Sequence, residues 1–162
     1  MKDGLAYDHD TLKSLSQLLE RKVKDLDRAI RFNFIEVIGP KVVINAKKNG
    51  SYKDRTSNLR SSIGFILVKD GKIIRRGGFQ QASGGSESGD NGIKEGEKYA
   101  TELAKNASDG YTLIVVAGMN YARPVESKGF NVLSRSGKYL QKEVNDTVSY
   151  THLRAHETRS NL

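Results

Sequence analysis

The residues of this chain that could perform chemistry are few, and their spacing decides what chemistry is open to them. His152 and His156 are four residues apart, so on a helix they would share one face and could chelate a metal ion, with Glu157 beside them. Their order is not His-Glu-x-x-His, so the general base of a zinc protease is missing. We therefore predict no metal site.

A glycine-rich stretch, residues 77–92, contains Gly84 and Gly89 at the spacing of a phosphate-binding loop. Asp90 and Asn91 stand where such a loop requires Lys followed by Ser or Thr, and a carboxylate at that place repels phosphate. We interpret the stretch as a flexible loop, mobile or ordered only on assembly, and we predict no cofactor.

The sequence also contains no clear pattern for nucleophilic or acid–base catalysis. The chain has no Gly-x-Ser-x-Gly motif, and His9 is the only histidine outside the C-terminal tail. Glu95, Glu97 and Glu126 are acids that the fold would have to bring together for glycoside cleavage. The sequence therefore predicts that the chain is not an enzyme, with a small hydrolase as a rival hypothesis.

Length and composition set the outer limits. A chain of 162 residues is long enough for one domain with its own core. It has no cysteine, which excludes disulfides and thiolate metal sites. No apolar run approaches the roughly 20 residues that a membrane span needs, and no signal-type segment follows the N-terminus. We expect a soluble protein with no membrane partner.

The formal net charge is +8, and basic residues gather in 41–60 and in 69–76. The first cluster includes Lys47, Lys48, Lys53 and Arg55, which we predict to lie in a loop that faces DNA or a partner protein. The alternative is a solvated surface, because the basic excess is mild. Contact with phosphates would be independent of base sequence.

The elements that must position these residues follow from apolar periodicity. Residues 10–38 predict a long helix, because apolar side chains recur at steps of three and four. Gly39 and Pro40 are expected to interrupt this helix, and 42–44 to resume it. The stripe is long for a small domain, so we expect part of it to contact a neighbouring subunit. Its members are Leu12, Leu15, Leu19, Val23, Leu26, Ile30, Phe34 and Val37.

The middle of the chain predicts strands. Residues 59–80 read as a β-hairpin around Asp70-Gly71, with Ile63, Phe65 and Leu67 on one face. A helix over 93–107 and a buried strand from Tyr111 follow. We expect that strand to end before Pro124, which has no backbone donor and favours an extended Arg123.

The remaining residues predict a possible short strand over 130–133 and a helix over 136–148. This order gives an α+β fold: a long N-terminal helix, a β-hairpin and a further strand in a small mixed sheet, with one or two packed helices. We expect a single domain, residues 1–148. Residues 149–162 resemble translated adaptor sequence, and we predict that this tail is not native and is disordered.

Two motifs stand at the ends of these elements. Residues 54–63 read Asp-Arg-Thr-Ser-Asn-Leu-Arg-Ser-Ser-Ile, and residues 120–126 read Asn-Tyr-Ala-Arg-Pro-Val-Glu. Their order and spacing resemble the tail-component family of tailed bacteriophages, which contains head–tail joining, neck and tail-completion proteins. In that family a Thr-Gly-Asn-Leu-Arg-x-Ser-Ile pattern opens the hairpin, and a Tyr-Ala-x-x-Val-Glu pattern follows later.

The resemblance covers about residues 10–147. The matching positions are Thr56, Asn58, Leu59, Arg60, Ser62, Ile63, Tyr121, Ala122, Val125 and Glu126, with Gly129 shortly after them. The chain departs from the pattern in two places. Ser57 replaces a glycine, and 127–133 replace an aromatic-Gly-Thr sequence, so contacts of the loop after Glu126 do not transfer.

The resemblance implies a non-enzymatic virion protein that assembles with itself as a ring at the head–tail junction. Its partners would be portal, neck or tail-tube proteins, and it would pass through the host cytoplasm during assembly. Under this hypothesis Tyr121 and Val125 pack the end of the sheet, and Glu126 pairs or caps there. The alternative is a basic nucleic-acid-binding protein of a mobile element, which rests on net charge alone.

Overall fold

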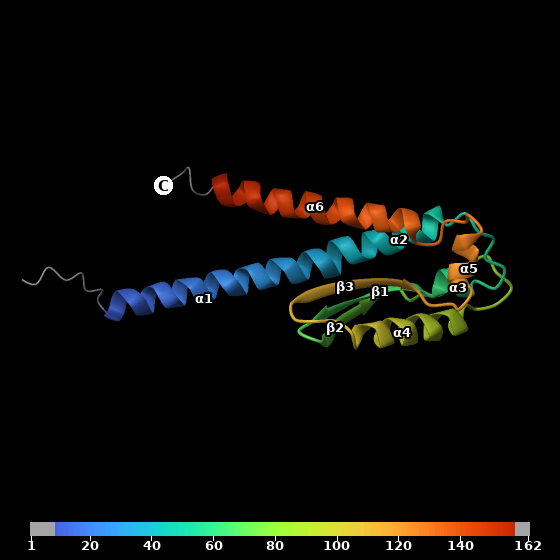
Figure 1. Ribbon diagram of the computed structural model, residues 1–162, viewed down its shortest axis with the longest axis horizontal. Helices are drawn as coiled ribbons and strands as arrows, with labels where there is room; N and C mark the ends of the chain where they lie inside the picture. Colours follow the sequence, from blue (N-terminus) through green and yellow to red (C-terminus); the bar gives the residue numbers. More distant parts are fainter. Residues whose placement is uncertain (1–8, 158–162) are drawn as a thin grey trace, which may run out of the picture. The chain divides into compact units, whose positions relative to one another are not determined.

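The first element is a helix, as the apolar periodicity predicts. The computed structural model describes the backbone of residues 9–157 and the side chains of residues 10–147 (Figure 1). The chain divides into two units, residues 1–33 and 34–162. The first unit contains α1 (His9–Phe32), and its apolar stripe is open to solvent, with Leu12 52% and Val23 66% exposed. Contact of this stripe with a neighbouring subunit stays a prediction.

The predicted interruption at Gly39 and Pro40 takes a different form. Residues Asn33–Ile38 form a π-helical turn, and α2 (Gly39–Asn49) begins directly after it. Pro40 lies in the first turn of α2, where its missing N–H is tolerated. The chain therefore stays helical, and the interruption takes the form of the wider π-helical turn before α2. A side chain on Gly39 would lie 2.7 Å from the ring of Phe65, so glycine allows α2 to approach the sheet.

Three strands form the sheet: β1 (Ile63–Lys69), β2 (Lys72–Gly77) and β3 (Tyr111–Ala117), in the order β2-β1-β3. The hairpin is confirmed, and Asp70 and Gly71 both have the positive φ that a tight hairpin turn requires. Both strand pairs are antiparallel, so the sheet is not mixed in strand direction.

The hairpin is shorter than predicted, because residues Asn58–Ser61 form a one-turn helix, α3, before β1 begins. The backbone turns at Ser57, whose φ is 62°. The Asp54 carboxylate then accepts hydrogen bonds from the backbone N–H groups of Leu59 and Arg60. Local capping therefore overrides the alternating pattern that suggested a strand from Leu59.

Helices cover both faces of the sheet, which gives the predicted α+β fold. On one face Ile63 and Phe65 pack with Val43 and Ala46 of α2. On the other face Ile66 and Val68 pack against α4 (Asp90–Ala104). The small residues Gly92, Gly96, Ala100 and Ala104 form the buried side of α4. β1 is buried on both faces and is the centre of the core.

The chain after β3 is helical where extended structure was expected. β3 ends at Ala117, and α5 (Ala122–Ser127) contains both Arg123 and Pro124. Pro124 lies in the first turn of α5, where backbone N–H groups have no helical acceptor, so it does not hinder the helix. Residues 130–133 form no strand but lead into α6 (Ser134–Glu157).

α6 begins close to the predicted start of the last helix and runs beyond its predicted end into the tail. It packs along α2. The side chains of the proposed non-native tail lie outside the described residues, so its origin stays a prediction. Within the described part of the chain, no helix has the length and apolar character needed to cross a membrane.

Candidate functional site

The two motifs that carry the family resemblance meet in space. Leu59 and Ile63 of the first motif pack in one core cluster with Ala122 and Val125 of the second. The backbone N–H of Gly118 donates to the carbonyl of Ser62 at 3.3 Å, directly beside the β1–β3 pair Ile63 and Ala117. We call this region, residues 54–63 together with 117–134, the corner. It joins segments that are about sixty residues apart along the chain.

Ser57, which replaces the glycine of the family pattern, lies where the backbone is left-handed, with φ at 62°. Glycine adopts this conformation without strain, whereas serine does so at a cost. The Ser57 hydroxyl accepts a hydrogen bond of 2.9 Å from the N–H of Gly85. A side chain at Gly85 would overlap Ser57, so the contact of the Ser57 hydroxyl with this loop requires glycine at position 85.

Asn58 of the first motif has both ends of its side-chain amide bonded, and it is 6% exposed. Its Nδ2 donates to Glu87 Oε2 at 2.8 Å, and its Oδ1 accepts from the N–H of Gly92 at 3.0 Å. Ser61 Oγ accepts from the N–H of Ala82 at 2.9 Å. The glycine-rich loop predicted to be flexible is therefore tied to the corner by hydrogen bonds within the chain.

Arg60 binds the carboxyl end of α2. Its guanidinium donates to the carbonyls of Lys47 at 3.2 Å and Gly50 at 3.4 Å, and it lies 5.1 Å from the ring centre of Tyr52. A cation placed there also complements the negative end of the helix dipole. Because these contacts occupy the guanidinium, Arg60 acts as a structural tie.

Tyr52 belongs to this site, and the sequence reasoning missed it. Its ring is buried in the core cluster that includes Leu59 and Ile63. Burial raises the pKa of Tyr52 to about 12, and its hydroxyl is a buried polar atom without a hydrogen-bond partner among the described residues. Tyr52 stands between the basic end of a helix and a polar loop, and nothing in its sequence neighbours indicates whether its side chain lies in the core or at the surface.

Glu126 caps the start of α6, as the capping hypothesis for this residue requires. Its carboxylate accepts from the N–H groups of Val132 at 3.3 Å, Leu133 at 3.2 Å and Ser134 at 2.9 Å, and from the Ser134 hydroxyl. Burial alone would raise the pKa of Glu126, but the bonds from Ser134, Leu133 and Val132 outweigh it and hold the pKa below its usual value.

The other residues of the second motif have distinct places. Val125 packs against the core cluster and Ala122 is buried within it, which fits the expected packing at the end of the sheet. Tyr121 differs, because it is 36% exposed and is not part of that cluster. Gly129 has a φ of 87° and serves the turn after α5.

Asn131 is a second residue that the motifs did not indicate. Its Nδ2 donates to the carbonyl of Asn49 at 2.9 Å, and its backbone N–H donates to Ser51 Oγ at 2.8 Å. Its Oδ1 accepts from the N–H of Arg135 at 3.1 Å, in the first turn of α6. Asn131 thus ties the end of α2 to the start of α6. An asparagine just before a helix is a recognisable capping signal.

The predicted basic loop is not a single loop. Lys47 and Lys48 lie in the last turn of α2, and only Lys53 and Arg55 lie in the loop that follows. Lys47 Nζ donates to the carbonyls of Gly78 at 2.6 Å and Gln80 at 3.4 Å, and burial lowers its pKa to about 8. Lys48, Lys53 and Arg55 are exposed.

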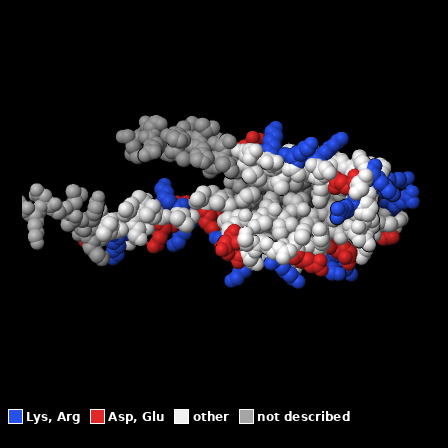
Figure 2. Space-filling model, viewed as in Figure 1, with Lys and Arg blue, Asp and Glu red and all other residues white. Residues whose placement is uncertain are grey.

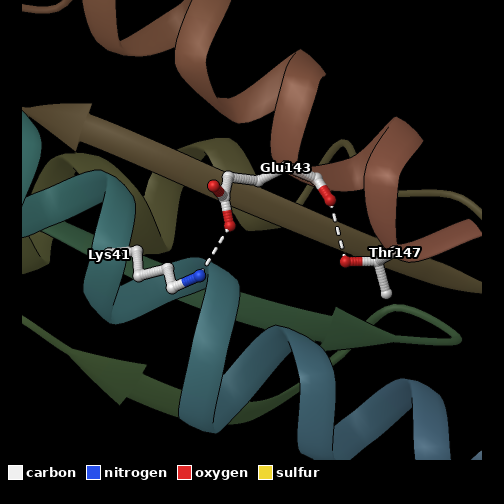
Figure 3. A network of polar contacts seen from close by, with 3 residues as sticks. All are labelled: Lys41, Glu143 and Thr147. Carbon is white, nitrogen blue, oxygen red and sulfur yellow. Dashed lines mark hydrogen bonds and ion pairs between the residues drawn. The ribbon is translucent and has the colours of Figure 1, made fainter. Parts of the chain in front are cut away.

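The surface charges of the second unit are mixed in sign. On the face shown in Figure 2, Lys and Arg lie around the rim with Asp and Glu between them. One of these charges joins two helices: Lys41 Nζ of α2 lies 2.9 Å from Glu143 Oε2 of α6, and Thr147 Oγ1 donates to the Glu143 carbonyl at 2.8 Å (Figure 3). Exposed pairs of this kind stabilise a protein little.

The polar atoms of the corner are therefore used to bind the chain's own backbone. Among the described residues, no group of three or more acidic or histidine side chains is placed to hold a metal ion. His152, His156 and Glu157 lie outside the described side chains. No family model, curated protein or solved structure matches this chain.

Proposed function

We propose that this chain is a structural protein of a tailed-bacteriophage virion, which assembles as a ring at the head–tail junction and acts in head–tail joining or tail completion. The observation that carries the proposal is the meeting of the two motifs at the corner. Leu59 and Ile63 of the first motif share a core cluster with Ala122 and Val125 of the second, so both motifs belong to one structural element.

The chemistry of the corner supports a structural role. The Glu126 carboxylate accepts from backbone N–H groups at the start of α6. Asn58 accepts from the N–H of Gly92 in α4 and donates to Glu87 of the glycine-rich loop, so the two side chains hold helix ends and a loop in place. A catalytic acid or base needs a polar atom that reaches a substrate. The bonding of these side chains favours a frame on which other proteins assemble.

α1 supports self-association. A helix with a long exposed apolar stripe is typical of a surface that another chain covers. A closed ring needs repeated head-to-tail contacts, for which such a helix is suited. The other partners would be portal, neck or tail-tube proteins, and Lys48, Lys53 and Arg55 would contact DNA in the lumen without reading its sequence.

The location can be tested on particles. An antibody against the purified chain, bound to intact phage particles and viewed by electron microscopy with a gold label, should mark the junction of head and tail. Label on the capsid or tail tip, or absence of the chain from purified particles, would contradict the proposal.

A second candidate, a nucleic-acid-binding protein of a mobile element, is favoured by the net charge of +8 and by the exposure of Lys48, Lys53 and Arg55. Binding of the purified chain to duplex DNA, measured over a range of salt concentrations, separates the two. Tight binding that weakens steeply with salt and is lost when these three residues become alanine would favour the second candidate.

A further inference from the structure

The two edges of the sheet are different in kind. The β2 edge exposes Lys72, Arg75 and Arg76, and a bulge interrupts its pairing with β1. Charges and bulges are the usual means by which a protein prevents another strand from pairing with an edge. β3, at the other edge, contains no charged residue and is only half-buried over most of its length.

Among the described residues, no strand pairs with the outer edge of β3, which presents a definite set of backbone groups. At its two ends, Asp70 N–H donates to the carbonyl of Gly110, and Gly118 N–H donates to the carbonyl of Ser62. In an antiparallel pair, every second residue directs its N–H and C=O groups to the partner strand. Gly110 and Gly118 both do so, and Ile114 lies an even number of residues from each, so its backbone groups also point to β1. Leu113 and Val115 therefore direct their N–H and C=O groups away from β1.

Two mainly apolar hollows flank this edge. One, of about 380 Å³, is lined by Tyr99 and Leu103 of α4 together with Val115 and Leu133, and also by Arg123 and Glu126 of α5. The other, of about 350 Å³, is lined by Val115 and Leu133 again, with Leu140 of α6. Figure 2 shows uncharged side chains over the middle of the face along which β3 runs, with the charges at its rim.

We propose that this edge is the contact with a second copy of the chain, formed by antiparallel pairing of β3 with β3 across a two-fold axis. The outward groups fix the register: Leu113 of one copy would exchange hydrogen bonds with Val115 of the other, and Ile114 would lie opposite Ile114. The two sheets would join into one of six strands, with α4 of both copies on the same face.

The chemistry of the edge favours a second copy as its occupant. A two-fold contact places the same patch on both sides, so an edge without charge meets no like charge, whereas pairing at β2 would oppose lysine and arginine side chains. At the rim, Lys98 and Glu102 of α4 and Arg123 of α5 provide both signs for contacts across the axis. This contact does not depend on the proposed place in the virion.

A single cysteine tests the register directly, because the chain has none of its own. Opposed residues in a non-hydrogen-bonded antiparallel pair have Cα atoms about 4.5 Å apart, which suits a disulfide. Ile114→Cys should therefore form a disulfide-linked dimer under mild oxidation, at least about tenfold more than Ile74→Cys, the matched half-buried isoleucine on the guarded β2 edge.

A second variant separates the interface from folding. Thr112→Lys places a charge on the β3 edge and leaves the β1–β3 backbone bonds in place. We expect the wild-type chain to sediment as a dimer and the variant as a monomer with an unchanged circular dichroism spectrum, its dissociation constant raised at least about tenfold. Equal cross-linking at positions 114 and 74, or a wild-type monomer at all concentrations, would overturn the proposal.

Discussion

Replacing Glu126 removes the acceptor that holds the first turn of α6. In the Glu126→Ala variant the N–H groups of Leu133 and Ser134 lose a charged partner. Loss of a helix cap costs about 0.5–2 kcal/mol, and a hydrogen bond to a charged group contributes about 1.5–3 kcal/mol. Water can reach Ser134, which is exposed, so we expect a net loss of about 1–3 kcal/mol in the free energy of unfolding.

The assay is urea unfolding followed by circular dichroism, with Asp146→Asn as the control. Asp146 is an exposed acid on α6, and its neutralisation should change stability by less than about 0.5 kcal/mol. Glu126→Gln keeps one acceptor oxygen but loses the charge, so it should fall between the alanine variant and the wild type. For a chain of this size, each kcal/mol corresponds to about 2–4 °C in Tm.

The pH dependence gives a second, independent readout. Because the pKa of Glu126 is held below its usual value of 4.5, the folded chain favours the ionised carboxylate more than the unfolded chain does. The advantage of the wild type over Glu126→Gln should be complete above that usual pKa and should disappear as the pH falls through the lower, folded value. Equal stability of Glu126→Ala and Asp146→Asn near neutral pH, or a difference that does not change in acid, would refute the capping role.

Further substitutions test the packing around the corner. Gly92→Ala should destabilise the chain by more than about 2 kcal/mol, because the new methyl group would lie 2.1 Å from the Asn58 carbonyl oxygen. Its control is Gly137→Ala in α6, where the methyl group meets no atom within 4 Å and should stabilise the chain by up to about 1 kcal/mol. Asn58→Ala should cost about 2–3 kcal/mol in urea unfolding, and Asn120→Ala, at an exposed position of the same region, close to nothing. Because the pKa of Lys47 is lowered to about 8, the unfolded chain holds more protons between about 8 and the ordinary 10.5, so wild-type stability should rise with pH across that window relative to Lys47→Met. A fall or no change across the window would contradict the burial of that ammonium group.

Sequence patterns predicted the parts of the fold that depend on neighbouring residues. The steps of three and four gave α1, and Asp70-Gly71 gave the hairpin. α3 was missed because its start depends on Asp54, whose carboxylate caps it from outside the turn. α5 was missed because Pro124 was interpreted as a strand terminator, although a proline is equally suited to a first helical turn.

The candidate site shows the same division. The sequence identified both motifs, and the resemblance implied that Glu126 pairs or caps at the end of the sheet. Its carboxylate instead caps the start of α6, eight residues further along the chain. The division of the basic residues between the end of α2 and the loop after it was not predictable. The position of the Lys47 side chain depends on its contact with Gly78, thirty-one residues away. Tyr52 gains its importance from contacts that only the folded chain creates. Asn131 combines a local capping bond to Arg135, which the sequence signals, with a long-range bond to Asn49, which it does not.

The central claim is that this chain joins head and tail, and deletion of its gene tests it most directly. Electron microscopy of the particles made by a phage or prophage that lacks the gene should show DNA-filled heads and separate tails. Complementation with the wild-type gene should restore joined particles. Complete, infectious particles formed without the gene would contradict the account.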